Sequence, residues 1–386
     1  MIKRDLQQKI IRTAQKIPVI SVTGPRQSGK TTLVKSSFPD YKYINFEDPA
    51  VREFAAEDPS SFLKAYGKRI IIDEVQYVPS LFSYIQLAVD EDKSRRFILT
   101  GSQNFLLLHK ISQSLAGRVS VFTLLPFSIE ELKRSSFEKE DYEEYLLSGF
   151  YPRIYDRKLN PSEWLNDYIR TYVERDVRQI TNIGDLHRFQ QFLKLCSGRI
   201  GQLVNLSSFG NELGISYHTA QSWLSVLEAS YIIFRLYPYH ANFNKRLVKS
   251  PKIYFFDTGI ASLLLGIKST EELHLHYAKG MLFENLVISE IYKARTNRGL
   301  LPESYFWRDN SGHEVDLILD KGLNKKAIEI KSSRTIGDDS FIGLEYWKKL
   351  SNSTSDSLFL VYGGDDSYKR SKCTALSWKN IDMVAD

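Results

Sequence analysis

Residues 24–31, GPRQSGKT, have the spacing GxxxxGK[ST] of a phosphate-binding loop. Successive backbone N–H groups of such a loop point inward, where they can cradle a polyphosphate. Lys30 can reach the β- and γ-phosphates, and the hydroxyl of Thr31 can ligate Mg²⁺. The apolar run 19–22 predicts a strand before the loop, and residues 32–34 predict a helix after it. We therefore expect a nucleotide site here rather than a chance glycine-rich turn.

Residues 68–74, KRIIIDE, form an apolar run that ends in two carboxylates. Asp73 can hold Mg²⁺ through its water shell, and Glu74 can polarise an attacking water. A strand that merely ends in acidic turn residues is the alternative. Together with the loop, the pattern predicts binding and hydrolysis of ATP with Mg²⁺. The residues expected to bind the nucleotide are Gly24, Pro25, Arg26, Gln27, Ser28, Gly29, Lys30, Thr31, Thr32 and Asp73, with Thr31 and Asp73 on the magnesium.

Two further positions could act on the γ-phosphate. The apolar run 96–100 leads into GSQN, at the sheet edge where α/β proteins bind ligands, so Ser102 or Asn104 could orient the water. A turn with local side-chain hydrogen bonds is the alternative. Arg118 could stabilise the transferring phosphoryl group from across a subunit interface, or it could pair with a surface carboxylate. The expected catalytic residues are Glu74, Asn104 and Arg118.

A third segment has helix-turn-helix spacing. Residues 205–213 predict a short helix after a serine cap, 214–216 a tight turn, and 217–229 a second helix. Strand-like runs at 231–237 and 252–256 could pair as a wing. The second helix would bury one face, formed by Ala220, Trp223, Leu224 and Leu227.

This segment could contact DNA. Candidates for base edges are Tyr217, His218, Gln221 and Ser222 on the second helix, and candidates for phosphates are Lys245, Arg246 and Lys249 in the basic joint of the wing. The second helix carries no Lys or Arg, however, so a packing and communication role remains the alternative.

Carboxylates and a lysine also recur near the C-terminus. The runs EVDLIL and AIEIK flank a turn at 320–324, and a hairpin there would set Asp316 opposite Glu329, with Lys331 on the face of Glu329. Glu284 lies in an apolar helical stretch, where a buried carboxylate needs a metal, Lys331 or a backbone cap as its partner. Glu284, Asp316, Glu329 and Lys331 could hold a divalent metal that activates water for phosphodiester attack. A hairpin with a solvated polar face is the alternative.

The elements that must position these residues follow from the hydrophobic pattern. Apolar runs alternate with helical patterns, which indicates a parallel sheet covered on both faces; the runs are 19–22, 43–46, 69–73, 97–100 and 119–124. We expect an α/β protein with four parts: a phosphate-loop ATPase core at 1–130, a helical lid or linker at 131–184, a winged helix-turn-helix at 185–256, and a mixed α/β domain at 257–386.

Composition sets wider limits. The 386 residues suggest two to three domains, and 42% apolar with 25% charged residues is typical of a globular chain. A net charge of +6 permits a polyanion partner without requiring one. Cys196 and Cys373 lie far apart, so we expect neither a disulfide framework nor a zinc site, and a cytoplasmic location. The N-terminus does not have the pattern of a signal peptide, and we expect no membrane span.

The motifs taken together resemble a prokaryotic family of AAA-type ATPases fused to a C-terminal region of unknown function that ends in a restriction-endonuclease-like domain. The likeness lies in GPRQSGKTTL, IIIDEVQ, LTGSQN, LAGR, TYVERDVRQI, the helix pair at 206–228, KIYFFDTGIA, GMLFENLV, and EVDLIL with IEIKSS, which span nearly the whole chain.

The resemblance implies a nucleotide-binding core, a small helical region, a winged helix and a PD-(D/E)xK-like fold. Glu284, Asp316, Glu329 and Lys331 match the nuclease pattern, and Val315 replaces its usual proline without changing the ligands. Such folds are also kept as inactive binding modules. We therefore expect an ATPase that couples nucleotide state to a DNA-associated C-terminal region and could assemble as a homo-oligomer. An ATP-gated nuclease and a nucleotide-controlled scaffold for a protein partner are the alternatives.

Overall fold

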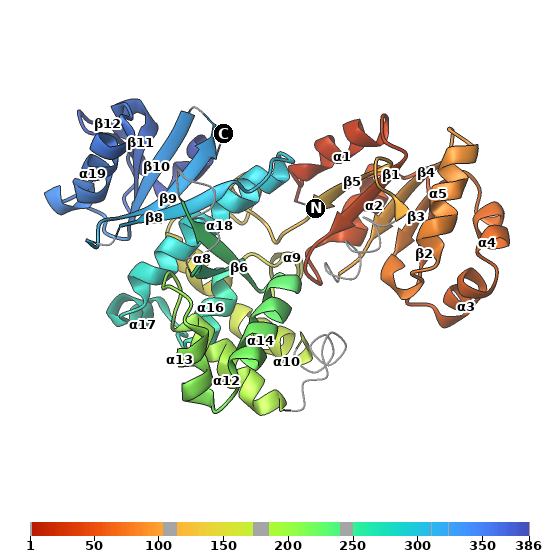
Figure 1. Ribbon diagram of the computed structural model, residues 1–386, viewed down its shortest axis with the longest axis horizontal. Helices are drawn as coiled ribbons and strands as arrows, with labels where there is room; N and C mark the ends of the chain where they lie inside the picture. The colour runs from red at the N-terminus through yellow and green to blue at the C-terminus, as the bar shows by residue number, and fades with distance from the viewer. Residues whose placement is uncertain are drawn as a thin grey trace. The chain divides into compact units, whose positions relative to one another are not determined.

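The computed structural model describes residues 2–102, 114–172, 185–239, 250–309, 311–322 and 324–385 (Figure 1). Contacts divide the chain into two compact units. Unit 1 comprises Met1–Phe127, Ala229–Tyr231 and Thr296–Leu300, and unit 2 comprises Ser128–Glu228, Ile232–Arg295 and Leu301–Asp386. The four-part division expected from the sequence stays a prediction.

Unit 1 is built on a five-stranded parallel sheet in the order β2-β3-β4-β1-β5. The strands are β1 (Val19–Thr23), β2 (Lys42–Asn45), β3 (Arg69–Asp73), β4 (Arg96–Thr100) and β5 (Val119–Thr123). The predicted parallel sheet is therefore confirmed, with strand bounds within one residue of those expected from the apolar runs.

Helices cover both faces of this sheet (Figure 1). They are α1 (Leu6–Ala14), α2 (Lys30–Ser37), α3 (Pro49–Glu57), α4 (Pro59–Ala65) and α5 (Leu81–Glu91), with the short turn η1 (Val75–Tyr77) after β3. Successive residues of β3 point to opposite faces, so Ile70 and Ile72 pack in one apolar cluster and Ile71 in the other. Burial on both sides explains why these strands are continuous apolar runs.

Unit 2 contains an eight-stranded mixed sheet in the order β12-β13-β11-β10-β9-β8-β6-β7. The strands are β6 (Ile233–Pro238), β7 (Lys252–Phe255), β8 (Ser304–Arg308), β9 (Glu314–Lys321), β10 (Asn324–Lys331), β11 (Leu358–Tyr362), β12 (Tyr368–Lys369) and β13 (Thr374–Ser377). The predicted hairpin is confirmed, because β9 and β10 pair antiparallel with Asn324 opposite Lys321 and Ile328 opposite Leu317.

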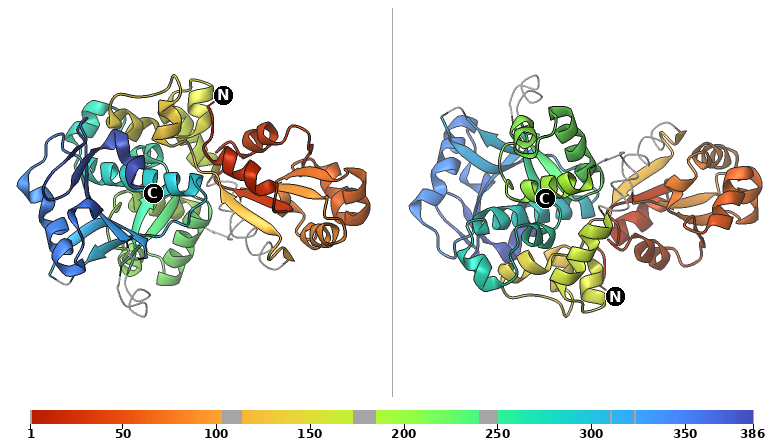
Figure 2. Two further views of the ribbon diagram at one scale, coloured as in Figure 1. Left: turned by 90° about the horizontal axis from the view of Figure 1, so that it is seen from above. Right: turned by 90° about the horizontal axis from the view of Figure 1, so that it is seen from below.

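Along the chain, the helices of unit 2 lie before and between the strands of this sheet (Figures 1 and 2). They are α7 (Ile129–Lys133), α8 (Tyr142–Ser148), α9 (Pro152–Asp156), α10 (Pro161–Tyr172), α12 (Leu186–Ser197), α13 (Leu206–Leu213), α14 (Tyr217–Ala229), α16 (Thr258–Leu264), α17 (Thr270–Leu275), α18 (Lys279–Asn297) and α19 (Ile342–Ser351). No helix in the described ranges combines the length and apolar character needed to cross a membrane.

The predicted helix pair is present as α13 and α14, and Trp223 of α14 packs edge-on against Phe189 and Phe192 of α12. The predicted serine cap is wrong: Asn205 caps α13, because its side chain accepts a hydrogen bond of 3.0 Å from the backbone N–H of Ser208. The two predicted wing strands do pair antiparallel as β6 and β7. They belong to the large sheet, however, since β6 also pairs with β8.

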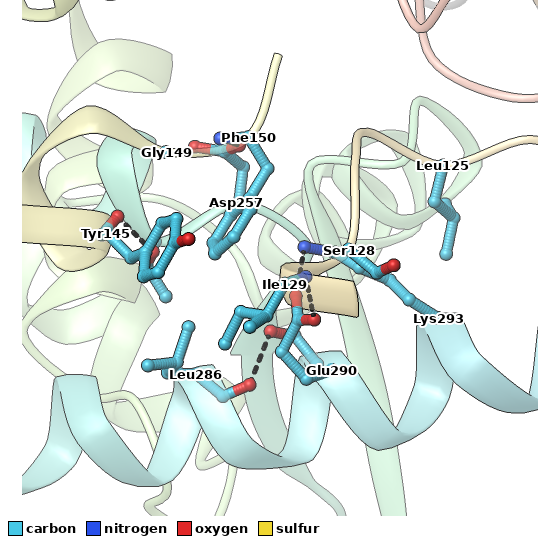
Figure 3. Close-up of polar contacts among 12 residues, drawn as sticks. Leu125, Ser128, Ile129, Tyr145, Gly149, Phe150, Asp257, Leu286, Glu290 and Lys293 are labelled. Carbon is cyan, nitrogen blue, oxygen red and sulfur yellow. Dashed lines mark hydrogen bonds and ion pairs between the residues drawn. The ribbon is translucent and has the colours of Figure 1, made fainter. Parts of the chain in front are cut away.

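A buried ion pair on α18 binds the N-terminus of α7, at the start of unit 2 (Figure 3). Glu290 accepts one hydrogen bond of 2.7 Å from Lys293 and another of 2.6 Å from the backbone N–H of Ile129, in the first turn of α7. Lys293 also lies 3.7 Å from the ring centroid of Phe150. Burial raises the pKa of Glu290, and the charge of Lys293 opposes that rise. The pair therefore satisfies a charge that would be costly alone in this core.

Candidate functional site

The phosphate loop lies between β1 and α2. Residues 24–29 form the turn, and Lys30, Thr31 and Thr32 begin the helix. Gly24 has φ 141°, and a Cβ there would meet the carbonyl oxygen of Leu124 at 2.1 Å, so no other residue fits. Gly29 caps α2 with φ 92°. The loop therefore leads directly into the N-terminus of α2, and helix N-termini bind anions through their free N–H groups.

Arg4, which the sequence pattern did not indicate, ties the loop to a neighbouring segment. Its guanidinium donates to the carbonyl oxygen of Ser28 at 2.8 Å and to that of Leu125 at 2.6 Å, and the side chain is buried. A planar guanidinium can bridge two carbonyls in this way because its donors are fixed relative to one another. Arg4 thus helps to hold the loop in place.

Lys30 is turned back onto the loop. Its ammonium donates to the carbonyl oxygens of Gly24 at 3.0 Å and Pro25 at 2.8 Å, and the residue is only 6% exposed. A buried ammonium needs such acceptors. A phosphate held by the loop would offer it charged acceptors in exchange, and hydrogen bonds between charged groups are the stronger kind.

Asp73 ends β3 and gathers three hydroxyl donors. Thr31 donates to Oδ2 at 2.7 Å and Tyr43 donates to the same oxygen at 2.8 Å, while Thr100 donates to Oδ1. Burial, followed by the charge of Asp73, raises the pKa of Tyr43, so this phenol stays protonated and donates. The hard oxygen atoms of Asp73 and Thr31 are of the type that Mg²⁺ prefers, and the pair fits a magnesium ion bound beside a phosphate.

Glu74 follows directly and adopts a left-handed conformation with φ 54° and ψ 45°. Its Oε2 accepts hydrogen bonds from Gln76 Nε2 and from Ser102 Oγ, the latter at 3.2 Å. Non-glycine residues in this region of backbone space carry strain, which functional sites commonly store. The structure thus brings Ser102 to Glu74, whereas Asn104 lies outside the described residues.

Arg118 lies at the opposite edge of the sheet from the phosphate loop. Its carbonyl oxygen accepts a 3.2 Å hydrogen bond from the N–H of Val19, at the start of β1, whereas the loop follows the end of that strand. Its guanidinium makes two hydrogen bonds of 2.7 Å to Asp90. Pairing with a surface carboxylate, the alternative left open by the sequence, is confirmed. Action on the nucleotide of another subunit stays a prediction.

A second group of charged residues lies in unit 2. The C-terminal charge cluster consists of Lys252, Tyr254, Glu284, Glu314, Asp316, Glu329 and Lys331, from β7, α18, β9 and β10. As the hairpin predicts, Asp316 reaches β10, where its Oδ2 accepts a 2.8 Å hydrogen bond from the N–H of Ile330. Lys331 donates to Glu329 Oε1 at 2.8 Å.

Lys252 and Tyr254, which the sequence interpretation missed, are the partners of Glu284. Tyr254 donates to Glu284 Oε1 at 2.5 Å. The ammonium of Lys252 lies 3.6 Å from the same oxygen and also pairs with Glu314, with the lysine side chain only 4% exposed. The strand β7 carries both residues on alternate positions, so both side chains point to one face of the sheet.

Burial is the main cause of the raised carboxyl pKa values in this cluster. It raises the pKa of Glu284 to about 7 and that of Glu329 to about 8, and the charge of Asp316 adds to both rises. Burial also raises the pKa of Asp316, against the attraction of Lys252 and Lys331. The carboxylates are therefore close enough to disfavour one another's ionised forms.

Three carboxylates of the cluster have ammonium partners in the structure. In the described ranges, no three or more His, Cys, Asp or Glu side chains are grouped so that they could hold one. The ammonium of Lys252 supplies the positive charge that a metal would bring. Metal binding by Glu284, Asp316, Glu329 and Lys331 stays a prediction.

The predicted DNA-contacting residues of α14 are solvent-exposed. Tyr217 is 49% exposed at the start of the helix, and His218, Gln221 and Ser222 are exposed beside it. The predicted phosphate contacts, Lys245, Arg246 and Lys249, lie outside the described residues. DNA contact by this segment stays a prediction.

Comparisons with known proteins define the class first. Residues 16–133 match the family model described as an AAA domain, so unit 1 is an α/β ATPase-type domain with a phosphate loop. Residues 139–271 and 279–381 match two models described as domains of unknown function, DUF8612 and DUF4143. None of these three descriptions names a winged helix or a nuclease.

Curated relatives then define the family. Uncharacterized proteins of Mycobacterium tuberculosis and Mycobacterium bovis are each 30% identical over 338 residues, which is 86% of this chain and 74% of the relative. An uncharacterized protein of Methanocaldococcus jannaschii is 22% identical over 374 residues, 82% of this chain and 77% of that one. The chain belongs to the family of these mycobacterial proteins.

Solved structures are similar at lower levels. The Walker-type ATPase of Pyrococcus abyssi has a TM-score of 0.47 at 16% identity, covering 69% of this chain and 96% of that one. The RuvB Holliday junction branch migration motor of Thermotoga maritima has a TM-score of 0.33 at 19% identity, covering 61% and 90%.

Proposed function

We propose that the chain binds ATP with Mg²⁺ in unit 1 and hydrolyses it. The observation that carries this proposal is that Thr31, which follows Lys30 at the start of α2, donates a hydrogen bond to Asp73 at the end of β3. On binding, Lys30 exchanges the carbonyls of Gly24 and Pro25 for phosphate oxygens. When bound between Thr31, Asp73 and the nucleotide, magnesium supplies positive charge that offsets the charge of the phosphates.

Glu74 is the proposed general base. Its carboxylate follows Asp73 directly, so it lies beside the site of the γ-phosphate, and two donors fix its orientation. A carboxylate held in this way can accept the proton of an attacking water.

Calorimetric titration with ATP tests the binding site. Lys30→Ala removes two hydrogen bonds to charged acceptors, worth about 1.5 kcal/mol each, so the ATP affinity should fall about 100-fold. Lys64→Ala, an exposed lysine on α4, is the matched control and should leave the affinity unchanged. Equal ATP affinities of the Lys30 variant and the wild type contradict the proposal.

Steady-state hydrolysis tests the chemistry separately. Glu74→Gln keeps the shape of the side chain but removes the base, so kcat should fall at least about 100-fold while the ATP affinity stays the same. Retention of full activity in this variant would exclude Glu74 as the base without touching the binding proposal.

We further propose that unit 2 responds to nucleotide state while bound to DNA. The exposed residues Tyr217, His218 and Gln221 on α14, and the excess of basic residues in the chain, support DNA as the partner. Tyr217→Ala with Gln221→Ala should weaken binding to duplex DNA at low salt, whereas Tyr277→Ala, also exposed, should not. Absence of any salt-sensitive DNA binding by the wild type favours a protein partner instead.

A nuclease is the second candidate function. It is supported by the electrostatic coupling of Glu284, Asp316, Glu329 and Lys331, and opposed by Lys252, whose ammonium already pairs with Glu284 and Glu314. The wild type and Asp316→Ala are incubated with DNA or RNA in the presence of Mg²⁺ or Mn²⁺, with and without ATP. Cleavage by the wild type alone supports a nuclease, and equal or absent cleavage argues against it.

A further inference from the structure

The hydrogen bonds around Glu74 leave one oxygen of its carboxylate free for a substrate. Gln76, in the turn η1, and Ser102, after β4, both donate to Oε2. Oε1 accepts no hydrogen bond from any residue in the described ranges. An ionised carboxylate acts only as an acceptor, so Oε1 is ready to take a hydrogen from a bound molecule.

The amide of Gln76 presents a second acceptor beside it. Because its Nε2 faces the carboxylate, its Oε1 must point elsewhere; this oxygen is buried and accepts no hydrogen bond from the residues that the structure describes. A buried amide oxygen without a donor costs about 1–3 kcal/mol, so a bound molecule that donates to it would gain this energy. A small donor that reaches both this oxygen and Oε1 of Glu74 would satisfy both groups.

Water in line with the γ-phosphate meets these requirements. It has two hydrogens, and Glu74 Oε1 and Gln76 Oε1 are two acceptors attached to groups that are already hydrogen-bonded to each other. When both hydrogens are taken, a lone pair of the water oxygen is left to face phosphorus. Glutamine side chains orient the attacking water in phosphate-loop GTPases.

We propose that Gln76 is a catalytic residue of ATP hydrolysis: its Nε2 fixes Glu74, and its Oε1 accepts a hydrogen of the attacking water. The inference rests on the proposed function of unit 1. In the step, a bond forms between the water oxygen and the γ-phosphorus, and the bond from that phosphorus to the β–γ bridging oxygen breaks. The electron pair leaves with ADP, and the proton of the water passes to Glu74. Gln76 keeps its own protons throughout.

The first test compares Gln76→Leu with Gln8→Leu, an exposed glutamine on α1. Loss of water orientation should lower kcat of the Gln76 variant about 100-fold. Its affinities for ATP and ADP should stay within about threefold of wild type, because Gln76 does not contact the bound nucleotide in this scheme. The control should match the wild type in both measurements.

A second variant separates orientation from packing. Gln76→Glu keeps an oxygen acceptor but loses the N–H donor to Glu74 unless its carboxyl group is protonated. Its kcat, divided by that of the wild type, should therefore rise as the pH falls, which a purely structural role would not produce.

The outcomes distinguish the inference from the function on which it rests. If the wild type hydrolyses ATP, Glu74→Gln is inactive and Gln76→Leu is fully active, the role of Gln76 is overturned. The proposed function of unit 1 then still stands. Parallel loss of kcat and of nucleotide binding in Gln76→Leu also overturns it, since the residue would then support the fold of the loop. Wild-type protein that neither binds nor hydrolyses ATP overturns the proposed function and the inference together.

Discussion

The phosphate-loop site and the C-terminal charge cluster each gather carboxylate and lysine side chains, yet the two sites satisfy these charges differently. At the loop, Asp73 receives three neutral hydroxyl donors and Lys30 donates to two neutral carbonyls. In the cluster, the ammoniums of Lys252 and Lys331 lie directly against carboxylates. Neutral partners are readily exchanged for a charged ligand, whereas an internal ion pair has to be broken first.

The contrast teaches that acidic residues and a lysine in proximity do not by themselves indicate a ligand site. What decides is the partner that each charge already has in the folded chain. By this criterion unit 1 is arranged for a charged ligand, and the cluster in unit 2 is closer to a self-neutralised core. The predictions below test that distinction, starting with the largest effect.

Removal of the internal cation should be the most damaging change. Lys252→Met keeps the length of the side chain but leaves the buried Glu284 without its ammonium, while Glu314 keeps Arg308, so the free energy of unfolding should fall by about 3–5 kcal/mol. Urea unfolding measures this loss. The matched control is Lys369→Met, whose side chain is 80% exposed, where a change within about 1 kcal/mol is expected. Similar small changes in both variants would show that Lys252 does not hold the cluster together.

Stability should depend on pH through the same cluster. The folded-state pKa values of Glu284, about 7, and Glu329, about 8, exceed the ordinary value of 4.5. At pH values between 4.5 and these raised pKa values, the folded chain retains protons that the unfolded chain has released. The free energy of unfolding should therefore be highest below about pH 4.5 as far as these groups contribute, and fall as the pH rises to about 8.

Glu329→Gln tests this assignment, because it removes one of the two titrating groups. Urea unfolding at about pH 5 and about pH 8 should show a smaller difference for this variant than for the wild type. Glu345→Gln is the control: its carboxyl group is exposed and pairs with Lys372, which lowers its pKa, so the difference should stay as in the wild type. A wild-type stability that does not change over this range would contradict the assignment.

The smallest effect is expected at the phosphate-loop site. Tyr43→Phe removes one of the two donors to Asp73 Oδ2 and leaves Thr31 in place, so the free energy of unfolding should fall by about 1 kcal/mol. The ATP affinity should change little, since neutral donors here are exchangeable. Tyr41→Phe, whose hydroxyl has no hydrogen bond to a residue in the described ranges, is the control. Loss of ATP binding in the Tyr43 variant would mean that the hydroxyl is part of the site.

Much of unit 1 could be predicted from the sequence because its signals are local. Each strand is an apolar run, and the loop has a fixed spacing, so β3 was placed at Arg69–Asp73 and the loop beside it. The hairpin of β9 and β10 followed from its turn and alternation in the same way. Arg118 was expected among the catalytic residues, although a residue that precedes a strand of a parallel sheet lies at the edge opposite the loop.

Several site residues could not be identified from the sequence, because their partners are distant along the chain. Lys252 and Tyr254 meet Glu284 only through the placement of β7 beside α18, and no periodicity specifies that placement. Arg4 and Tyr43 reach the phosphate loop and Asp73 from elements that carry no motif. Gln76 is part of the motif IIIDEVQ, but its role depends on the turn of the chain at Glu74.

The resting position of Lys30 has a consequence for what unit 1 can recognise. Its ammonium is already satisfied by two carbonyls, so an incoming molecule gains nothing from it unless it brings negatively charged oxygens of its own. A nucleoside without phosphates cannot make that exchange. Selection at this loop therefore begins with the phosphate chain, before any contact with the base.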